Sequence, residues 1–182
     1  MKKLMFMLAA AVAVASAQAA SVYWTCTNVK DGSGNAIDGV AYFINAATLS
    51  QDAFKALSGA DAFNTALSGM YSYTPTEAGK YTVASSAAVE NSTLGLSDST
   101  SYSVYLAVFD TATITDSSNY YLTTPATLQT LTGSNYAQVK WGSQSTASQA
   151  AGAWTSVNVP EPTSGLLMLV GLAGLALRRR RT

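Results

Sequence analysis

Residues 101–110 read Ser-Tyr-Ser-Val-Tyr-Leu-Ala-Val-Phe-Asp, the most apolar run of the chain between its two terminal segments. Side chains alternate between the two faces of a β-strand. One face of this run carries Tyr102, Val104, Leu106 and Val108, and the other carries Tyr105, Ala107 and Phe109. Because both faces are apolar, both must be covered by other parts of the protein. The run therefore predicts a central strand of a β-sheet.

Other segments on both sides of this run also have strand patterns, with turn residues between them. They are residues 22–29, 40–45, 80–89, 119–124, 136–141 and 153–159. Together they predict a mainly β fold, an antiparallel β-sandwich of about seven strands. Residues 30–39 are rich in Gly, Asn and Asp, which predicts a hairpin between the first two strands. Residues 142–152, rich in Ser, Gln and Ala, are expected to form a loop.

Two similar segments predict two short helices inserted near residues 50–69. They are residues 52–59 (DAFKALSG) and 61–69 (DAFNTALSG), each with a Phe and a Leu three or four residues apart. This spacing places both side chains on one helix face, and glycine is typical just past a helix end. We expect two Phe–Leu pairs to pack on the sheet: Phe54 with Leu57, and Phe63 with Leu67.

The N-terminus has the pattern of a secretory signal peptide. Basic residues Lys2 and Lys3 precede an apolar stretch, and Ala17 and Ala19 supply the small residues that signal peptidase requires. An uncleaved membrane anchor is the alternative, but about 12 apolar residues are too few to span a bilayer. We therefore predict a signal helix in residues 1–19, cleavage after Ala19, and an exported domain in residues 20–158. Ala15-Ser16-Ala17 offers a second cleavage site two residues earlier.

The C-terminal segment, residues 159–182, reads VPEPTSGLLMLVGLAGLALRRRRT. Pro160-Glu161-Pro162 cannot be helical, because each proline fixes φ and lacks an N–H donor. The uncharged run that follows spans about 22 Å as a helix, against a hydrocarbon core of about 30 Å. Arginine side chains can reach the interface, so a transmembrane helix is predicted. Its orientation is set by Arg178, Arg179, Arg180 and Arg181, since positive charge stays on the cytoplasmic side.

A buried core helix is the alternative for this segment, but four adjacent arginines do not fit a globular core. The order of a Pro-Glu-Pro motif, an apolar run and terminal arginines resembles a PEP-CTERM sorting signal. The resemblance implies that an exosortase, a membrane-embedded protease or transpeptidase, recognises Pro160, Glu161 and Pro162 and cleaves the tail. It also implies a transient membrane stage and an association with exopolysaccharide or biofilm matrix. It covers the tail alone and implies nothing about residues 20–158.

Charge separates the two ends from the exported domain. The chain has ten Lys and Arg and ten Asp and Glu, but six of the basic residues lie in the two terminal segments. Residues 20–158 keep four lysines and nine acids, a net charge of about −5. Nucleic acids and anionic membrane surfaces attract clustered Lys and Arg. The acidic domain is therefore not expected to bind nucleic acid.

No pattern in the exported domain is typical of an enzyme. The chain has no histidine, so it lacks the commonest general base and the usual zinc ligand. Its one cysteine, Cys26, shares a strand face with Val22 and Trp24, which predicts a buried, inert thiol. The carboxylate pairs Asp52 with Asp61 and Asp110 with Asp116 have ordinary spacings for surface acids. We predict no catalytic residue, no metal and no cofactor.

Two binding hypotheses remain beside this prediction. Asp31, Ser33, Asn35 and Asp38 resemble a calcium loop, but Ala36 replaces the turn glycine and no glutamate closes it, so a plain turn is favoured. Trp141, Trp154 and the Tyr120-Tyr121 pair are candidates for a sugar-stacking platform, although such large aromatics usually fill a core. The Asn91-Ser92-Thr93 glycosylation pattern is taken as incidental.

These observations predict an exported structural protein of the cell surface or extracellular matrix. The protein would reach that location through an inner-membrane intermediate. Signal peptidase and an exosortase would process it, and exopolysaccharide is the partner that the resemblance implies. The alternatives are a carbohydrate-binding surface module and an unprocessed single-pass membrane protein.

Overall fold

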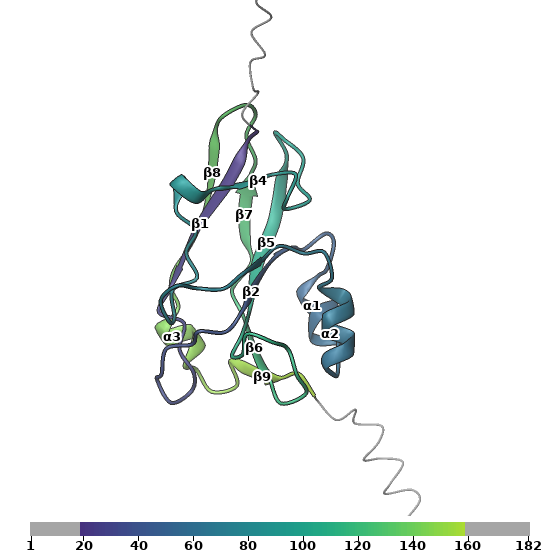
Figure 1. Cartoon of the computed structure of the whole chain (residues 1–182), viewed down its shortest axis with the longest axis vertical. Helices are drawn as coiled ribbons and strands as arrows, with labels where there is room; N and C mark the ends of the chain where they lie inside the picture. Colours follow the sequence, from purple (N-terminus) through teal and green to yellow (C-terminus); the bar gives the residue numbers. More distant parts are fainter. Residues whose placement is uncertain (1–18, 159–182) are drawn as a thin grey trace, which may run out of the picture.

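Strand β5 (Ser101–Phe109) is the centre of the larger of two β-sheets in this computed structural model, which describes residues 19–158 (Figure 1). One side of β5 pairs with β2, and the other side pairs with β7 and then β6. All pairs in this sheet are antiparallel, so the prediction of a central strand is confirmed. The other strands are β2 (Ala41–Asn45), β3 (Ser72–Tyr73), β6 (Asn119–Leu122), β7 (Ala126–Gln129) and β9 (Trp154–Ser156).

The two faces of β5 belong to two separate hydrophobic cores, as its alternation predicts. Val104, Leu106 and Val108 lie in the first core. Tyr105, Ala107 and Phe109 lie in the second core. All six side chains are 0–1% exposed, so one strand organises both interiors of the domain.

The smaller sheet has the order β4-β1-β8, with β1 (Ser21–Thr27) in the middle. Strand β4 (Val89–Glu90) is antiparallel to β1, whereas β8 (Tyr136–Ser143) is parallel to it. The prediction of antiparallel strands is therefore wrong for the β1–β8 pair. The predicted hairpin is also wrong, because β1 and β2 lie in different sheets. Residues 30–39 still form a tight turn, closed by a bridge between Lys30 and Ala36.

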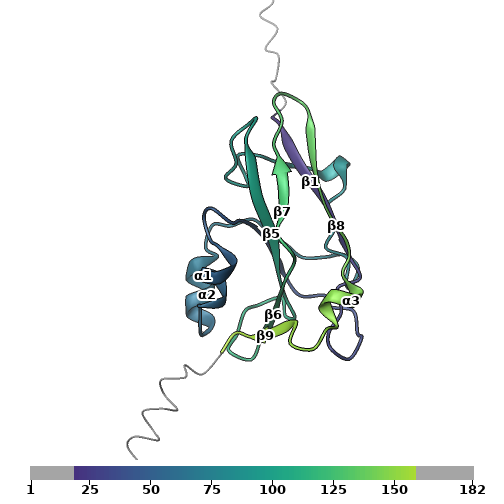
Figure 2. The ribbon, with the colours of Figure 1, turned by 180° about the vertical axis from the view of Figure 1, so that it is seen from behind.

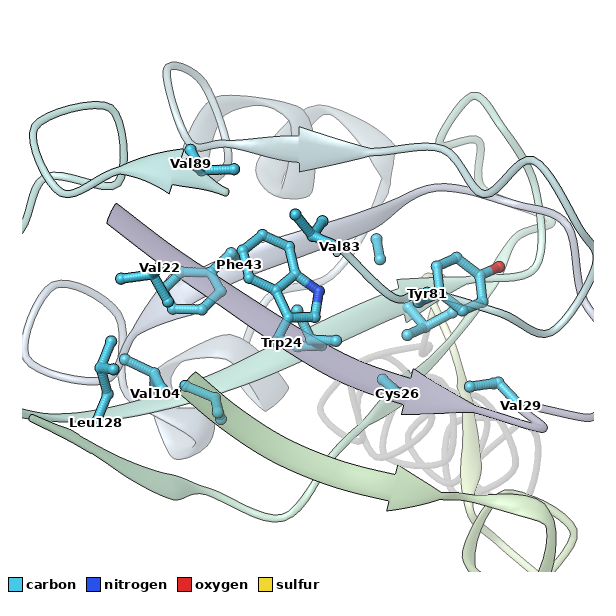
Figure 3. Packing of buried hydrophobic residues seen from close by; sticks show 14 of the residues in the cluster. Val22, Trp24, Cys26, Val29, Phe43, Tyr81, Val83, Val89, Val104 and Leu128 are labelled. Carbon is cyan, nitrogen blue, oxygen red and sulfur yellow. The ribbon is translucent and has the colours of Figure 1, made fainter. Parts of the chain in front are cut away.

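The first core lies between the two sheets (Figure 3). Trp24 of β1 packs against Phe43 of β2, with ring centroids 5.0 Å apart. Tyr81 and Val83 reach this core from the segment that crosses β1. Cys26 is completely buried on the same face of β1 as Trp24, as predicted.

Helices α1 (Gln51–Lys55) and α2 (Ala60–Ala66) cover the other face of the larger sheet, as both ribbon views show (Figures 1 and 2). Phe54 and Phe63 are fully buried and contact each other, with ring centroids 5.2 Å apart. Both also contact Tyr120 of β6, at 5.1 and 5.3 Å. The predicted helices and their packing are confirmed, although Leu57 is only partly buried at the rim of this core.

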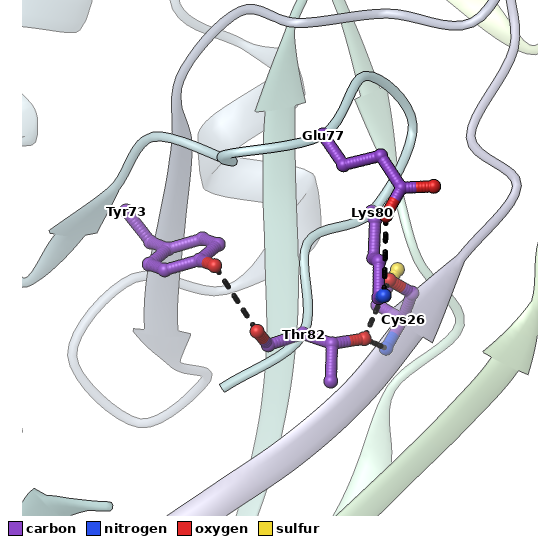
Figure 4. Close-up of polar contacts among 5 residues, drawn as sticks. All are labelled: Cys26, Tyr73, Glu77, Lys80 and Thr82. Carbon is purple, nitrogen blue, oxygen red and sulfur yellow. Dashed lines mark hydrogen bonds and ion pairs between the residues drawn. The ribbon is translucent and has the colours of Figure 1, made fainter. Parts of the chain in front are cut away.

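The segment predicted as a strand at residues 80–89 is mostly irregular. Val83 forms a single bridge with Trp24, a 3₁₀ turn spans Ser85–Ala87, and only Val89 enters a strand. Thr82 contacts β1 through its side-chain hydroxyl instead of through strand pairing (Figure 4). Its Oγ1 accepts from the Cys26 N–H and donates to the Cys26 carbonyl, both at 3.1 Å.

The predicted loop at residues 142–152 is also corrected, because β8 continues to Ser143 and a short helix α3 (Ser145–Ser148) follows. The predicted signal helix and transmembrane helix lie outside residues 19–158. Within that range, no helix is both long enough and apolar enough to span a bilayer.

Candidate functional site

At the C-terminal boundary of the described range, residues 19–158, Val157 is the last buried residue. This residue follows β9 and is fully buried in the second core. Its N–H donates to the Ser118 carbonyl and its carbonyl accepts from the Gly59 N–H, both at 2.9 Å. The next residue, Asn158, is exposed. The predicted sorting residues Pro160, Glu161 and Pro162, and the arginines Arg178, Arg179, Arg180 and Arg181, lie outside the described residues.

The N-terminal boundary falls at the predicted signal-peptidase bond. Ala19 is exposed, whereas Ala20 is 2% exposed and its carbonyl accepts from the Asn91 N–H at 2.9 Å. Ser21 donates its hydroxyl back to the Ala19 carbonyl. Ala17 lies outside the described residues, and cleavage after Ala19 stays a prediction. The predicted cleavage bond joins exposed Ala19 to Ala20, the first buried residue of the described range.

These two boundaries lie at opposite ends of the domain. Strand β1 begins at the upper end in Figure 1, and β9 lies at the lower end, and the reverse view shows the same separation (Figure 2). The sequence could not predict this separation without the strand order. It follows from the parallel pairing of β1 with β8 and the return of the chain through α3 to β9.

Of the candidate sugar-stacking residues, Tyr120 and Tyr121 are buried, whereas the two tryptophans are partly exposed in different surroundings. Trp141 of β8 is half-buried, donates its indole N–H to the Thr124 carbonyl at 3.0 Å, and packs edge-on against Phe43. Trp154 of β9 is half-buried, donates to the Lys30 carbonyl at 3.0 Å, and packs against Tyr121. Both rings contact the first core without being enclosed by it. They do not form one shared platform, because each packs on a different aromatic neighbour.

Trp154 lines a surface hollow of about 350 Å³. Its polar lining consists of Asp31, Asp110 and Asn119, and its other lining residues are Gly32, Ile37, Ala150, Gly152 and Trp154. Sequence reasoning considered Asp110 only as a partner of Asp116 and missed Asn119. The antiparallel pairing of β5 with β6 brings Asp110 next to Asn119. A predicted hairpin between these two strands would have placed the two residues together.

Both carboxylates of the hollow are held in fixed positions. Asp110 accepts from the Asn119 N–H and from its side-chain amide, one bond to each oxygen and both at 2.8 Å. Asp31 accepts from the N–H groups of Ser33 and Asn35 and from the Asn35 amide, at 2.8–3.0 Å. The bonds from Asn35 lower the pKa of Asp31 below its ordinary value, because they stabilise the charged form. This bonding confirms the turn at residues 30–39.

The other candidate acids lie apart and have structural contacts. Asp52 and Asp61 lie in the first turns of α1 and α2, where the helix dipole favours a negative charge. Asp116 accepts from the Ala60 N–H at 2.8 Å, so it is used at α2 rather than beside Asp110. In residues 19–158, no group of three or more His, Cys, Asp or Glu side chains is placed to hold a metal ion.

Two further groups have restricted chemistry. Burial raises the pKa of the Cys26 thiol to about 12, which keeps it protonated and unreactive at neutral pH. Asn91 is 3% exposed, and its side-chain amide donates to Asp98 at 2.7 Å. The side-chain nitrogen of Asn91, to which a glycan would be attached, is therefore hydrogen-bonded inside the fold.

Comparison with known proteins identifies the end of the chain alone. A family model described as the PEP-CTERM protein-sorting motif matches residues 158–181. The searches of curated proteins and of solved structures returned no match. The matched motif begins one residue after Val157, the last buried residue of the fold. The chain thus ends in a PEP-CTERM sorting signal, which indicates a protein that an exosortase sorts to the cell surface.

Proposed function

We propose that residues 20–158 form a non-catalytic structural domain that becomes part of the cell surface or extracellular matrix. Signal peptidase removes residues 1–19, and an exosortase removes the tail, residues 159–182, from an inner-membrane intermediate. The observation that carries this proposal is the sorting motif at residues 158–181, which directly follows the buried, doubly hydrogen-bonded Val157. We interpret the two sheets as a β-sandwich, which makes the domain stable. Exopolysaccharide is the proposed material around this domain.

The contacts of the candidate reactive groups support a non-catalytic role. The thiol of Cys26 is enclosed, Asp52 and Asp61 lie in the first turns of helices, and Asp116 accepts from the first N–H of α2. A general acid–base pair needs two groups within reach of one substrate. Of the pairs that the sequence offered, Asp110 and Asp116 have different partners, because Asp110 binds Asn119 while Asp116 binds Ala60.

Mass spectrometry of the mature protein from the native cell surface tests the processing. We expect the mature chain to begin at Ala20 and to lack Arg181 and Thr182. Substitution Glu161→Ala should leave more unprocessed protein in the inner membrane. The matched control is Glu77→Ala, since Glu77 is exposed and pairs only with Lys80 in an exposed ion pair. An intact Arg181-Thr182 end on the surface protein would support the unprocessed single-pass alternative instead.

A carbohydrate-binding module is the second candidate function. The half-exposed indoles of Trp141 and Trp154 favour it, because such rings stack on the apolar faces of sugars. Residues 20–158 contain every side chain of both described cores, so this fragment is suited to polysaccharide arrays. Saturable binding that is lost on Trp141→Ala or Trp154→Ala would favour this module. An absence of binding to every polysaccharide would leave the structural role.

A further inference from the structure

We propose that the hollow around Trp154 binds a neutral sugar ring, with the indole as its stacking surface and Asp31, Asp110 and Asn119 as its hydrogen-bonding groups. This inference rests on the carbohydrate-binding candidate and assigns it to one place in the fold. It separates Trp154 from Trp141, which is not part of the lining.

The stacking surface is already fixed before any ligand arrives. The indole N–H of Trp154 is bound to the Lys30 carbonyl, and its ring packs on Tyr121 with centroids 5.8 Å apart and planes tilted by 39°. A ring held at both its edge and its face loses little conformational freedom on binding. Rigid preorganisation of this kind favours affinity, because less ordering has to occur in the complex.

The carboxylates keep acceptor positions for sugar hydroxyl groups. Each carboxylate oxygen has two lone pairs. The two oxygens of Asp110 each accept one hydrogen bond, both from Asn119, so each retains one position. Asp31 holds two bonds on Oδ1 and one on Oδ2, which leaves a position on Oδ2. A hydroxyl that donates to a carboxylate forms a charge-assisted bond, about twice as strong as a neutral one.

Size and charge define the class of ligand. The volume of about 350 Å³ lies at the small end of ligand pockets, which run from about 300 to 1,000 Å³, and suits a short saccharide unit. Two fixed carboxylates repel a uronic acid, a sulfated sugar or a phosphate group. The domain as a whole also has nine acids and four lysines. The hollow therefore selects a neutral sugar over an acidic one.

The test uses the full-length chain, purified in a mild detergent, and two sets of probes. Neutral oligosaccharides (glucan, mannan and galactan fragments) are titrated by calorimetry, and oligouronides serve as the acidic comparison. Trp154→Ala should weaken neutral-sugar binding about tenfold. Trp141→Ala is the comparison variant, because that ring is also half-buried and also bound to a carbonyl. Loss of binding in Trp141→Ala alone would overturn the site at Trp154 and place the sugar at Trp141. Thermal unfolding of each variant verifies that it is folded.

A second pair of variants does not touch the core. Ala150 is exposed and lines the hollow, whereas its neighbour Ala151 is exposed and lies outside it. Ala150→Arg should fill the hollow and abolish binding, and Ala151→Arg adds the same charge and should leave binding unchanged. Loss in Trp154→Ala and Ala150→Arg with retention in both controls would support the site.

The opposing results have distinct meanings. Neutral-sugar binding that survives Trp154→Ala and Ala150→Arg would overturn this site and leave a carbohydrate function elsewhere on the domain. Preference for oligouronides would overturn the assignment to neutral sugars. Binding of neither set would overturn the inference together with the carbohydrate candidate, and the proposed structural role at the cell surface would stand.

Discussion

The carbonyl oxygen of Val157 accepts a hydrogen bond from the backbone N–H of Gly59, 2.9 Å away. Gly59 immediately precedes α2, so the last buried residue of the described range is tied to the helical layer. The sorting motif begins at the following residue. A cut within the tail therefore removes no contact that Val157 makes with Gly59 or Ser118, and the fold should survive processing.

Substitution Val157→Ala tests how strongly this boundary contributes to stability. The side chain is fully buried in the second core, and removing two methyl groups should lower the free energy of unfolding by about 2 kcal/mol. Urea denaturation of residues 20–158 measures the change. Asn158→Ala is the control and should be nearly neutral, because Asn158 is exposed. Equal losses from both substitutions would show that the boundary is misplaced.

Thr82→Val tests the hydroxyl that replaces strand pairing beside β1 (Figure 4). Valine has the same shape but leaves the N–H and carbonyl of buried Cys26 without this partner. The expected loss is about 2 kcal/mol in the free energy of unfolding, measured by urea denaturation. Thr82→Ser keeps both bonds and should lose clearly less. Similar losses would mean that the methyl group matters and the hydroxyl does not.

Gly39→Ala tests a close approach between two backbone segments. A Cβ at this position would overlap the Phe109 carbonyl and lie 2.6 Å from the Thr111 nitrogen. Neither backbone atom can move without disturbing the end of β5, so we expect a loss of about 3 kcal/mol or failure to fold. Gly32→Ala is the matched control, since a Cβ there meets nothing within 4 Å. Thermal unfolding compares the two, and a stable Gly39→Ala protein would contradict this packing.

The thiol of Cys26 should not react in the native protein. Burial raises its pKa to about 12, and the reactive thiolate is therefore scarce at pH 8. A colourimetric thiol reagent should detect close to no thiol at pH 8 without denaturant and one thiol per chain in guanidinium chloride. Fast reaction of the folded protein would mean that the first core opens readily.

Stability should fall at alkaline pH. Burial raises the pKa of Cys26 and Tyr121 to about 12, and it raises the pKa values of Tyr81 and Tyr105 well above their usual range. The unfolded chain loses these protons from about pH 9 to 10, whereas the folded chain retains them to about pH 12. Each group therefore contributes stability that is complete below pH 9 and that falls by about 1.4 kcal/mol per pH unit above its unfolded pKa.

Urea denaturation at pH 8, 10 and 11 measures this slope. Tyr121→Phe removes one titrating group, although it also removes the bond from Tyr121 to Gln144, so its stability should be lower at pH 8 but less dependent on pH. A slope equal to that of the unmodified protein would contradict the role of Tyr121.

Local patterns were sufficient to predict the features that depend on neighbouring residues. The pattern of β5 predicted both of its buried faces, because from Val104 to Phe109 every residue is apolar. The repeated Phe–Leu spacing predicted α1 and α2, and the buried rings of Phe54 and Phe63 confirm the faces that were expected to pack. The burial of Cys26 was predicted from the side-chain alternation in β1.

Features that depend on distant segments were not predictable. Turn residues at 30–39 suggested a hairpin, but they cannot state that β1 pairs with β8, more than a hundred residues later. Strand β7 has only four residues and follows β6 closely, so its pattern was too short to recognise. The hollow around Trp154 combines three separate segments, and only the fold brings Asp31 and Asp110 to the same ring.

The separation of the two boundaries, with β1 beginning at one end and β9 lying at the other, has a practical consequence for display (Figure 1). A reporter peptide inserted between Ala19 and Ala20 would stay on the mature chain and face away from an attachment made at Asn158. An antibody added to intact cells should reach such a peptide easily. The same peptide inserted beside Asn158 would sit against the anchoring layer and be shielded from it.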